Sequence, residues 1–129
     1  MGTNQLLLVV LGMMLVGVAI YVGVSMFSAN TVEATRNAII LDLGNFAARA
    51  NAYYWKLAVQ GGGGKSFAGI TMSQIYPMNE NVNARYFIEN VENDQCTITG
   101  VGKVVTTNGD SIRVRIRVTT QRNIVEILN

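Results

Sequence analysis

The sequence predicts an α+β protein in which one long amino-terminal helix is packed by a small antiparallel β-sheet. Two observations predict this fold. No side chain from Met1 to Val32 carries a charge, and the first charged residue is Glu33. From residue 85 onward, by contrast, apolar and polar residues alternate with a period of two, which is typical of half-buried strands. We therefore expect a helical stem over residues 1–60 and a β head over residues 61–129.

The first half of the stem is apolar on every side. Residues 6–27 read LLLVVLGMMLVGVAIYVGVSMF, interrupted only by Gly, Ser and Tyr. As a helix these residues span about 33 Å, enough to cross the hydrocarbon core of a bilayer. The rest of the chain is too small to cover such a helix on all sides, so this part must leave water in a bilayer or in a bundle of identical stems. A secretory signal peptide fits less well, because the start is neutral and the apolar run exceeds about 15 residues. Residues 1–30 are the expected hydrophobic assembly or transmembrane part.

Within this part we expect particular side chains to contact identical stems in an assembly: Gln5, Leu6, Leu7, Leu8, Val9, Val10, Leu11, Leu15, Ile20 and Phe27. Three glycines interrupt the apolar run, at spacings that form no Gly-x-x-x-Gly pair: Gly12, Gly17 and Gly23. They allow close helix contact or mark places where the helix can bend or extend. Simple tolerance of glycine in a lipid environment explains them equally well.

The second half of the stem, residues 31–60, is expected to be amphipathic. Its apolar residues follow one helical stripe: Val32, Ile39, Leu43, Phe46, Ala50, Tyr53 and Leu57. The charged residues lie off that stripe: Glu33, Arg36, Asp42, Arg49 and Lys56. The run Gly61–Gly64 should end the helix near Gln60 and act as a flexible connector. The aromatic residues before it, Tyr53, Tyr54 and Trp55, are expected to pack rather than to stack on a ligand.

The segment GGGGKS invites comparison with a phosphate-binding loop. That loop needs a first glycine where this chain has Val59, and it follows a strand rather than a helix. We therefore expect no phosphate loop here, and a solvated Lys65.

Four strands are expected in the head, over residues 85–91, 96–106, 111–119 and 124–128, with a further short strand over residues 69–75. The turn Thr107-Asn108-Gly109-Asp110 favours a hairpin, because Asn-Gly accepts positive φ. One face of the resulting meander should be buried. The stripe of the stem is the natural cover, with these packing contacts: Ile39, Leu43, Phe46, Ala50, Tyr53 and Leu57 on the helix, and Ile112, Val114, Ile116 and Val118 on the sheet.

Arg113, Arg115 and Arg117 alternate with the last of these apolar residues. A ladder of arginines can bind phosphate or nucleic acid. It can also be the solvated face of a strand, paired with Glu89, Glu92 or Glu126, and we favour this second interpretation. No nucleic-acid partner is expected.

Composition argues against an enzyme. The chain has no histidine, which is the commonest general base and metal ligand, and its only cysteine is Cys96. No pair of acids stands at a recognisable catalytic spacing. We expect no catalytic residues, no metal site and no cofactor.

A long helix, apolar first and amphipathic second, followed by a loop and a small antiparallel sheet, resembles a type IV pilin or pilin-like filament subunit. Met1-Gly2-Thr3-Asn4-Gln5-Leu6-Leu7-Leu8-Val9-Val10 is similar to a mature pilin start. The family has a glutamate at the fifth mature position, where this chain has Gln5, which can hydrogen-bond a terminal amine but cannot neutralise it. Its usual basic leader and helix proline are missing, so Met1 is the mature terminus or the chain is processed differently.

The resemblance implies a structural subunit of an extracellular, pilus-like filament at the surface of a prokaryotic cell. Its partners would be identical subunits in a helical homopolymer, and the cytoplasmic membrane before assembly. Two alternatives stay open: a membrane-anchored binding module with a single transmembrane span, and a minor pseudopilin of a secretion system.

Overall fold

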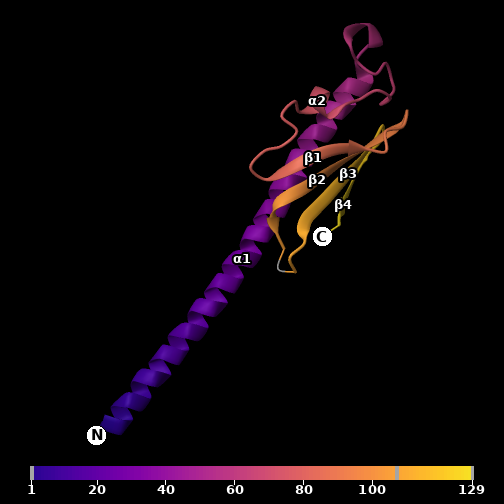
Figure 1. Ribbon diagram of the computed structural model, residues 1–129. Coiled ribbons are helices and arrows are strands. Elements are labelled where there is room, and N and C mark those ends of the chain that lie inside the picture. Colours follow the sequence, from indigo (N-terminus) through magenta and orange to yellow (C-terminus); the bar gives the residue numbers. More distant parts are fainter. Residues whose placement is uncertain (1, 107, 129) are drawn as a thin grey trace. The chain divides into compact units, whose positions relative to one another are not determined.

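The computed structural model describes residues 2–106 and 108–128, and it has the predicted α+β fold: one long helix and a four-stranded antiparallel sheet (Figure 1). Helix α1 (Gly2–Trp55) is followed by a short 3₁₀ helix η1 (Ala58–Gln60) and helix α2 (Met72–Ile75). Contacts divide the chain into two compact units, one up to Thr31 and one from Val32 onward. Met1, the first residue of the predicted stem, and Thr107, the first residue of the predicted hairpin turn, lie outside the described residues.

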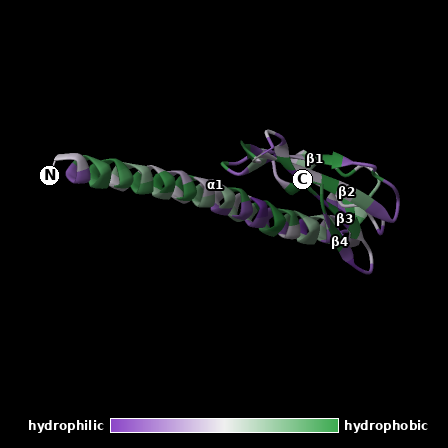
Figure 2. Ribbon diagram, turned by 90° about the horizontal axis from the view of Figure 1, so that it is seen from below, coloured by the Kyte–Doolittle hydropathy of each residue, from purple (hydrophilic) through white to green (hydrophobic). Residues whose placement is uncertain are grey.

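The first unit is the apolar part of α1. Figure 2 shows hydrophobic residues on successive turns of this part of the helix. No proline occurs before Pro77, so no residue here removes a helical hydrogen bond or clashes with the preceding turn. Near its end the hydroxyl of Thr31 donates to the carbonyl of Phe27 at 2.9 Å. This bond satisfies the threonine within the helix itself.

Helix α1 ends at Trp55, five residues before the predicted Gln60, because the glycine run folds back onto the helix end. The amides of Gly63 and Gly64 donate to the carbonyls of Tyr53 and Lys56, at 2.8 and 2.9 Å. The amide of Lys65 donates to the carbonyl of Tyr54 at 2.7 Å. These bonds satisfy carbonyl groups that a helix end leaves without intrahelical partners.

The glycines are therefore required by close contact, and the prediction of a loose connector missed this role. A Cβ on Gly62 would lie 2.3 Å from the Cβ of Lys56, and one on Gly63 would lie 1.8 Å from the carbonyl oxygen of Ser66. Leu57 lies in this turn beyond the helix and is 61% exposed. The expectation that Leu57 packs between helix and sheet is wrong, because the helical stripe stops before it.

We expect Gly63→Ala to lower the free energy of unfolding of the head by about 2 kcal/mol, because the turn must move to remove the clash. The matched control is Gly44→Ala, since Gly44 lies inside α1 and a Cβ there meets nothing within 4 Å. That control should stabilise the helix by up to about 1 kcal/mol. Urea unfolding in a nonionic detergent measures both. Equal midpoints for the two variants would contradict a closely packed turn.

The segment predicted as a strand over residues 69–75 is instead the short helix α2. Thr71 caps it: the backbone amide of Thr71 donates to the side-chain oxygen of Gln74 at 3.1 Å, and the Thr71 side chain completes a capping box. Ile75 on this helix is buried. A strand needs partners along its edge, whereas a capped helical turn satisfies its own amides locally, which explains the outcome.

The sheet is a meander in the order β1-β2-β3-β4, with every neighbouring pair antiparallel. Its strands agree with the predicted ones within two residues: β1 (Ala84–Glu89), β2 (Gln95–Val105), β3 (Ser111–Thr119) and β4 (Asn123–Ile127). Gly109, with φ of +89°, lies in the turn between β2 and β3.

Within the second unit, one face of the sheet packs on α1 in a single hydrophobic core. The helix supplies Val32, Ile39, Leu43, Phe46, Ala47 and Ala50, and β3 supplies Ile112, Val114, Ile116 and Val118, all buried. Tyr53 is half-buried at the margin. Gly100 sets the separation of the two layers, because a Cβ there would lie 2.9 Å from Ile39 and 3.0 Å from the ring of Tyr86.

Candidate functional site

The most unusual surface of the molecule is the apolar part of α1. Seventeen large apolar side chains between Leu6 and Phe27 are exposed, with exposed fractions from 47% to 75%. They include all the apolar residues predicted to make assembly contacts: Leu6, Leu7, Leu8, Val9, Val10, Leu11, Leu15, Ile20 and Phe27. Gln5 is exposed beside them. A contiguous apolar surface of this extent on a soluble monomer marks an interaction site.

By length and composition, α1 is the one described helix capable of crossing a membrane. The core helix of a soluble protein can pass the same test, but such a helix is mostly buried. None of the most apolar window of α1 is buried within the chain. Its apolar surface therefore has no partner among the described residues.

Gly12, Gly17 and Gly23 lie on this exposed segment, in regular helix. A Cβ added at any of the three would meet no atom within 4 Å. No contact within the described chain therefore requires glycine at these positions. A requirement for glycine at these positions would come from a partner chain or from lipid.

In the second unit, most exposed residues of α1 are uncharged. The exposed side of α1, opposite the buried stripe, carries small or uncharged residues over five turns: Ala34, Asn37, Leu41, Gly44, Asn45, Ala48 and Ala52. None of the charged residues predicted to lie off the stripe is among the buried residues of the helix. Leu41 alone exposes 70% of its surface there.

Charged residues of this helix segment form ion pairs or hydrogen bonds within their own unit. Arg36 pairs with Glu33 at 2.6 Å. Arg49 donates from Nη1 to the carbonyl of Ile75 at 2.7 Å. Asp42 accepts hydrogen bonds from the head. The periodicity of the sequence predicts that Asp42 and Arg49 lie off the core. It does not show that their side chains bond to the loops of the head.

Asp42 is the polar centre of the contact between helix and head. Its Oδ2 accepts hydrogen bonds from the hydroxyl of Tyr86 at 2.5 Å, from Nδ2 of Asn81 at 2.9 Å and from Nδ2 of Asn83 at 3.5 Å. Burial, together with the carboxylate of Asp42, raises the pKa of Tyr86 above its ordinary value. The tyrosine therefore stays protonated and donates to a carboxylate inside the core margin.

Sequence reasoning missed this cluster. The available clue was a carboxylate, Asp42, directly beside the core position Leu43. Three donors come from a loop and a strand about forty residues away, and no local pattern connects them to the helix. Only the register of β1 brings Tyr86 to this place.

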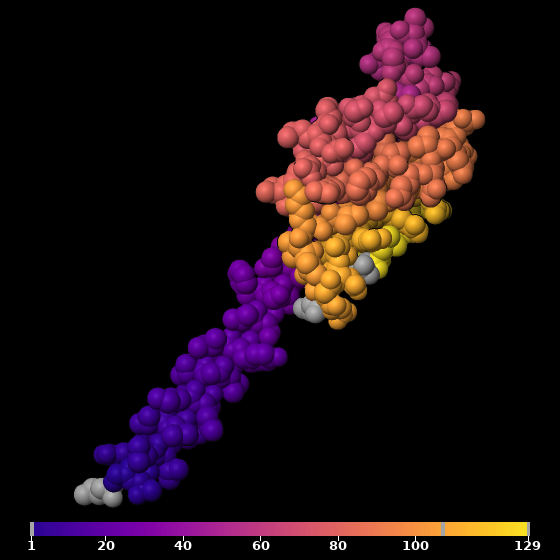
Figure 3. Space-filling view, in the orientation of Figure 1, coloured from indigo at the N-terminus to yellow at the C-terminus, as the bar shows by residue number. Residues whose placement is uncertain are grey.

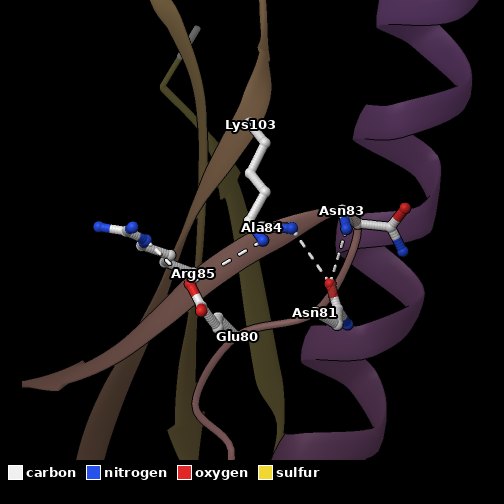
Figure 4. A network of polar contacts seen from close by, with 6 residues as sticks. All are labelled: Glu80, Asn81, Asn83, Ala84, Arg85 and Lys103. Atoms are coloured by element: carbon white, nitrogen blue, oxygen red, sulfur yellow. Dashed lines mark hydrogen bonds and ion pairs between the residues drawn. The ribbon is translucent and has the colours of Figure 1, made fainter.

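The loop before β1 presents the asparagines of the cluster. The side-chain oxygen of Asn81 accepts the amides of Asn83 and Ala84 at 2.8 and 3.1 Å, which turns the chain into the strand beside α1 (Figure 4). Glu80 pairs with Arg85 at 3.0 Å and lies 3.9 Å from Lys103 (Figure 4). This loop covers the edge of β1, so the edge offers fewer open backbone groups to another chain.

The arginine ladder lies on the face of the sheet away from the core. Arg115 pairs with Glu126 at 2.6 Å, and Arg117 lies 3.9 Å from the same carboxylate. This is one of the carboxylates proposed as partners for a solvated ladder. Arg113 makes no ion pair with any residue that the structure describes. Glu126 thus fixes Arg115 and compensates one of the three positive charges of the ladder.

Cys96 is completely buried in the core of the sheet. Burial raises the pKa of its thiol to about 11 from an ordinary value of 9.0. The folded state therefore keeps the thiol protonated at pH values where the unfolded chain loses that proton. No group of three or more His, Cys, Asp and Glu side chains within residues 2–106 and 108–128 is arranged to hold a metal ion.

The Cys96 thiol predicts a pH dependence of stability. Because its folded pKa is raised, its contribution is complete below the unfolded value near pH 9 and is lost as the pH rises towards 11. We expect the free energy of unfolding to fall by about 1 kcal/mol between pH 8 and pH 10 in the unmodified chain. The Cys96→Ala variant should lack this fall in the free energy of unfolding, because its other titratable groups are the same as in the unmodified chain. Parallel pH profiles for the two chains would contradict the assignment.

Comparison of the chain with protein-family models, with curated proteins and with solved structures gives no significant match.

Proposed function

We propose that this protein is the structural subunit of an extracellular, pilus-like filament that polymerises through a core of its amino-terminal helices. The observation that carries the proposal is the exposed apolar helix between Leu6 and Phe27, attached to a unit with a hydrophobic core of its own. The proposal includes no catalytic role, no cofactor and no nucleic-acid partner. Before assembly the helix would lie in the membrane.

The apolar surface of the stem requires a partner. Removing apolar surface from water gains about 25 cal/mol for each Å², so the seventeen exposed side chains have to be covered by lipid or by other stems. In a bilayer the same surface is already satisfied, so assembly there relies on close packing and on polar contacts. Asn4 and Gln5 at the start of α1 would need hydrogen-bond partners inside such a core.

The mostly uncharged exposed side of α1 in the second unit also supports a polymer. In a bundle, helices that carry like charges on facing surfaces would repel one another. Apart from Glu33 and Arg49, the exposed residues of α1 from Val32 to Trp55 are uncharged. Glu33 pairs with Arg36, and Arg49 bonds to the carbonyl of Ile75, so both are engaged within their own unit. This part of the helix is therefore compatible with close neighbours.

The experiment is electron microscopy of material sheared from the surface of cells that produce the protein, with mass spectrometry of the same material. We expect filaments that contain this chain as the main component. The mass of the intact chain reports processing and modification of the terminus. Recovery of the protein only as a monomer from detergent-solubilised membranes would contradict the proposal and would favour a membrane-anchored module.

A further inference from the structure

The turn at the carboxy-terminal end of α1 presents a second exposed apolar surface. We call the segment from Trp55 to Gly64 the distal tip. Trp55 and Leu57 are each 61% exposed and Val59 is 96% exposed. Within the second unit, the tip lies beyond the ends of the strands (Figures 1 and 3). Trp55 contacts the neighbouring ring of Tyr54, as the packing prediction requires, but its indole stays largely outside the core because the helix ends there.

The tip is held in place. Its backbone is fixed by hydrogen bonds from Gly63 and Gly64 to the carbonyls of the last helical turn. The ring of Trp55 meets that of Tyr54 edge to face at 5.1 Å between centroids, and Tyr54 in turn packs on the buried Phe67 at 4.8 Å. The exposed apolar side chains thus stand on a braced turn, which reduces the entropy lost when they bind a surface.

Beside the tip lies an open cavity of about 390 Å³, lined by Arg49, Ala52, Tyr53, Lys56, Gly61 and Gln74. Two of its lining residues are cationic, and none is acidic. Arg49 donates one hydrogen bond from Nη1 to the carbonyl of Ile75 at 2.7 Å. A guanidinium group has five N–H donors, so this bond uses one of them. The cavity therefore offers positive charge and hydrogen-bond donors to an anion.

Acidic residues are distant along the chain, since none occurs between Asp42 and Glu80. The turn between β1 and β2, which carries Glu92 and Asp94, contacts the chain after the tip through a 3.3 Å hydrogen bond from Ser66 to Asn93. Neither acid lines the cavity.

We propose that the distal tip binds anionic lipid membranes, with a headgroup phosphate in the cavity between Arg49 and Lys56 and with Trp55, Leu57 and Val59 in the interfacial layer. Tryptophan favours the interface between headgroups and hydrocarbon, and aliphatic side chains beside it gain from leaving water. Lysine and arginine near an anionic leaflet are attracted to its surface. This binding is independent of filament formation and goes beyond the proposed structural function.

The full chain is first reconstituted through its stem into vesicles of pure phosphatidylcholine, so that the stem is already satisfied. Fluorescent vesicles of phosphatidylcholine mixed with phosphatidylglycerol are then added, and their capture is measured by co-sedimentation. We expect capture of the anionic vesicles and none of neutral ones. Because Trp55 is the only tryptophan of the chain, its emission should shift to shorter wavelength on capture.

Two double variants test the two parts of the surface. Arg49→Gln with Lys56→Gln should weaken capture roughly 30-fold, from the loss of two charges near the membrane. Leu57→Ser with Val59→Ser should weaken it at least about tenfold while Trp55 still reports binding. The matched control is Lys103→Gln with Val82→Ser, which removes one exposed cation and a valine 89% exposed elsewhere on the head. Capture by the control should be unchanged.

Three outcomes would overturn the proposal. The first is equal capture by the chain and both tip variants. The second is binding of inorganic phosphate that is lost in the Arg49 and Lys56 variant while vesicles are not captured, which would make the cavity a site for free phosphate. The third is loss of filaments in the tip variants with unchanged vesicle capture, which would make the tip a contact with a second copy. Since capture needs no filaments, its failure leaves the filament test untouched.

Discussion

Replacing Leu15 by aspartate should abolish filaments while leaving the protein in the membrane. Leu15 is 64% exposed near the middle of the apolar segment. An aspartate at the centre of a membrane helix costs about 3 kcal/mol, whereas the remaining leucine, valine, isoleucine and phenylalanine residues of this segment favour insertion by roughly 4–7 kcal/mol. Insertion therefore survives a single charge.

A filament core is less tolerant than a bilayer. In a lipid environment the carboxylate can reach the interface or draw in water, but in a packed bundle every copy would bury the same unpaired charge. Repulsion and desolvation then recur at each step of the helical polymer. The measurement is electron microscopy of sheared material together with the amount of protein in the membrane fraction.

Two controls accompany this variant. Leu15→Met keeps the apolar character and nearly the volume, so filaments should persist. Val82→Asp places the same charge at an exposed position of the head, where it should leave assembly intact. Filaments of normal number in the Leu15→Asp variant would remove the stem from the proposed core. Loss of the protein from the membrane fraction would instead show that insertion had failed.

The second large effect is expected at Asp42. Replacing Asp42 by alanine should lower the free energy of unfolding of the head by about 3 kcal/mol or more. The change removes the acceptor of the buried hydroxyl of Tyr86 and of two asparagine amides. An unsatisfied buried donor costs about 1–3 kcal/mol, and hydrogen bonds to a charged acceptor are the stronger kind.

A double-mutant cycle identifies the pair responsible. Tyr86→Phe alone should cost about 1–2 kcal/mol, since it removes the donor together with its need for a partner. In combination with Asp42→Ala it should cost less than the two single changes added together, because no unsatisfied hydroxyl remains. Urea unfolding in a nonionic detergent, followed by tyrosine fluorescence, measures all three variants. Additive costs would show that Asp42 and Tyr86 act independently.

Much of the fold could be predicted because it rests on local patterns. The alternation of Ile112, Val114, Ile116 and Val118 with arginines allows one buried face only, and these four residues are buried. The spacing of Ile39, Leu43 and Phe46 likewise defines one helical face. Such periodicities follow from backbone geometry, which a sequence shows directly.

The errors fall where the outcome depends on contacts between distant segments. The end of α1 moved to Trp55 because the glycine run returns to its last carbonyls. Residues 69–75 form a capped helical turn in place of a strand. On the exposed side of α1, Asp42 and Arg49 bond to loops of the head. The helical pattern of the sequence does not show these bonds.

By itself the sequence determined that an uncharged stem must leave water and that a small sheet with one apolar face must cover an amphipathic helix. Both conclusions depend on composition and period, since apolar surface has to be buried whatever the details of the fold. Only the tertiary structure decided that Trp55, Leu57 and Val59 lie outside the core beside a cationic cavity, and that Asp42 joins the helix to the head. These features arise from side chains far apart in the chain, whose meeting is determined by strand register and by the turn of the glycine run.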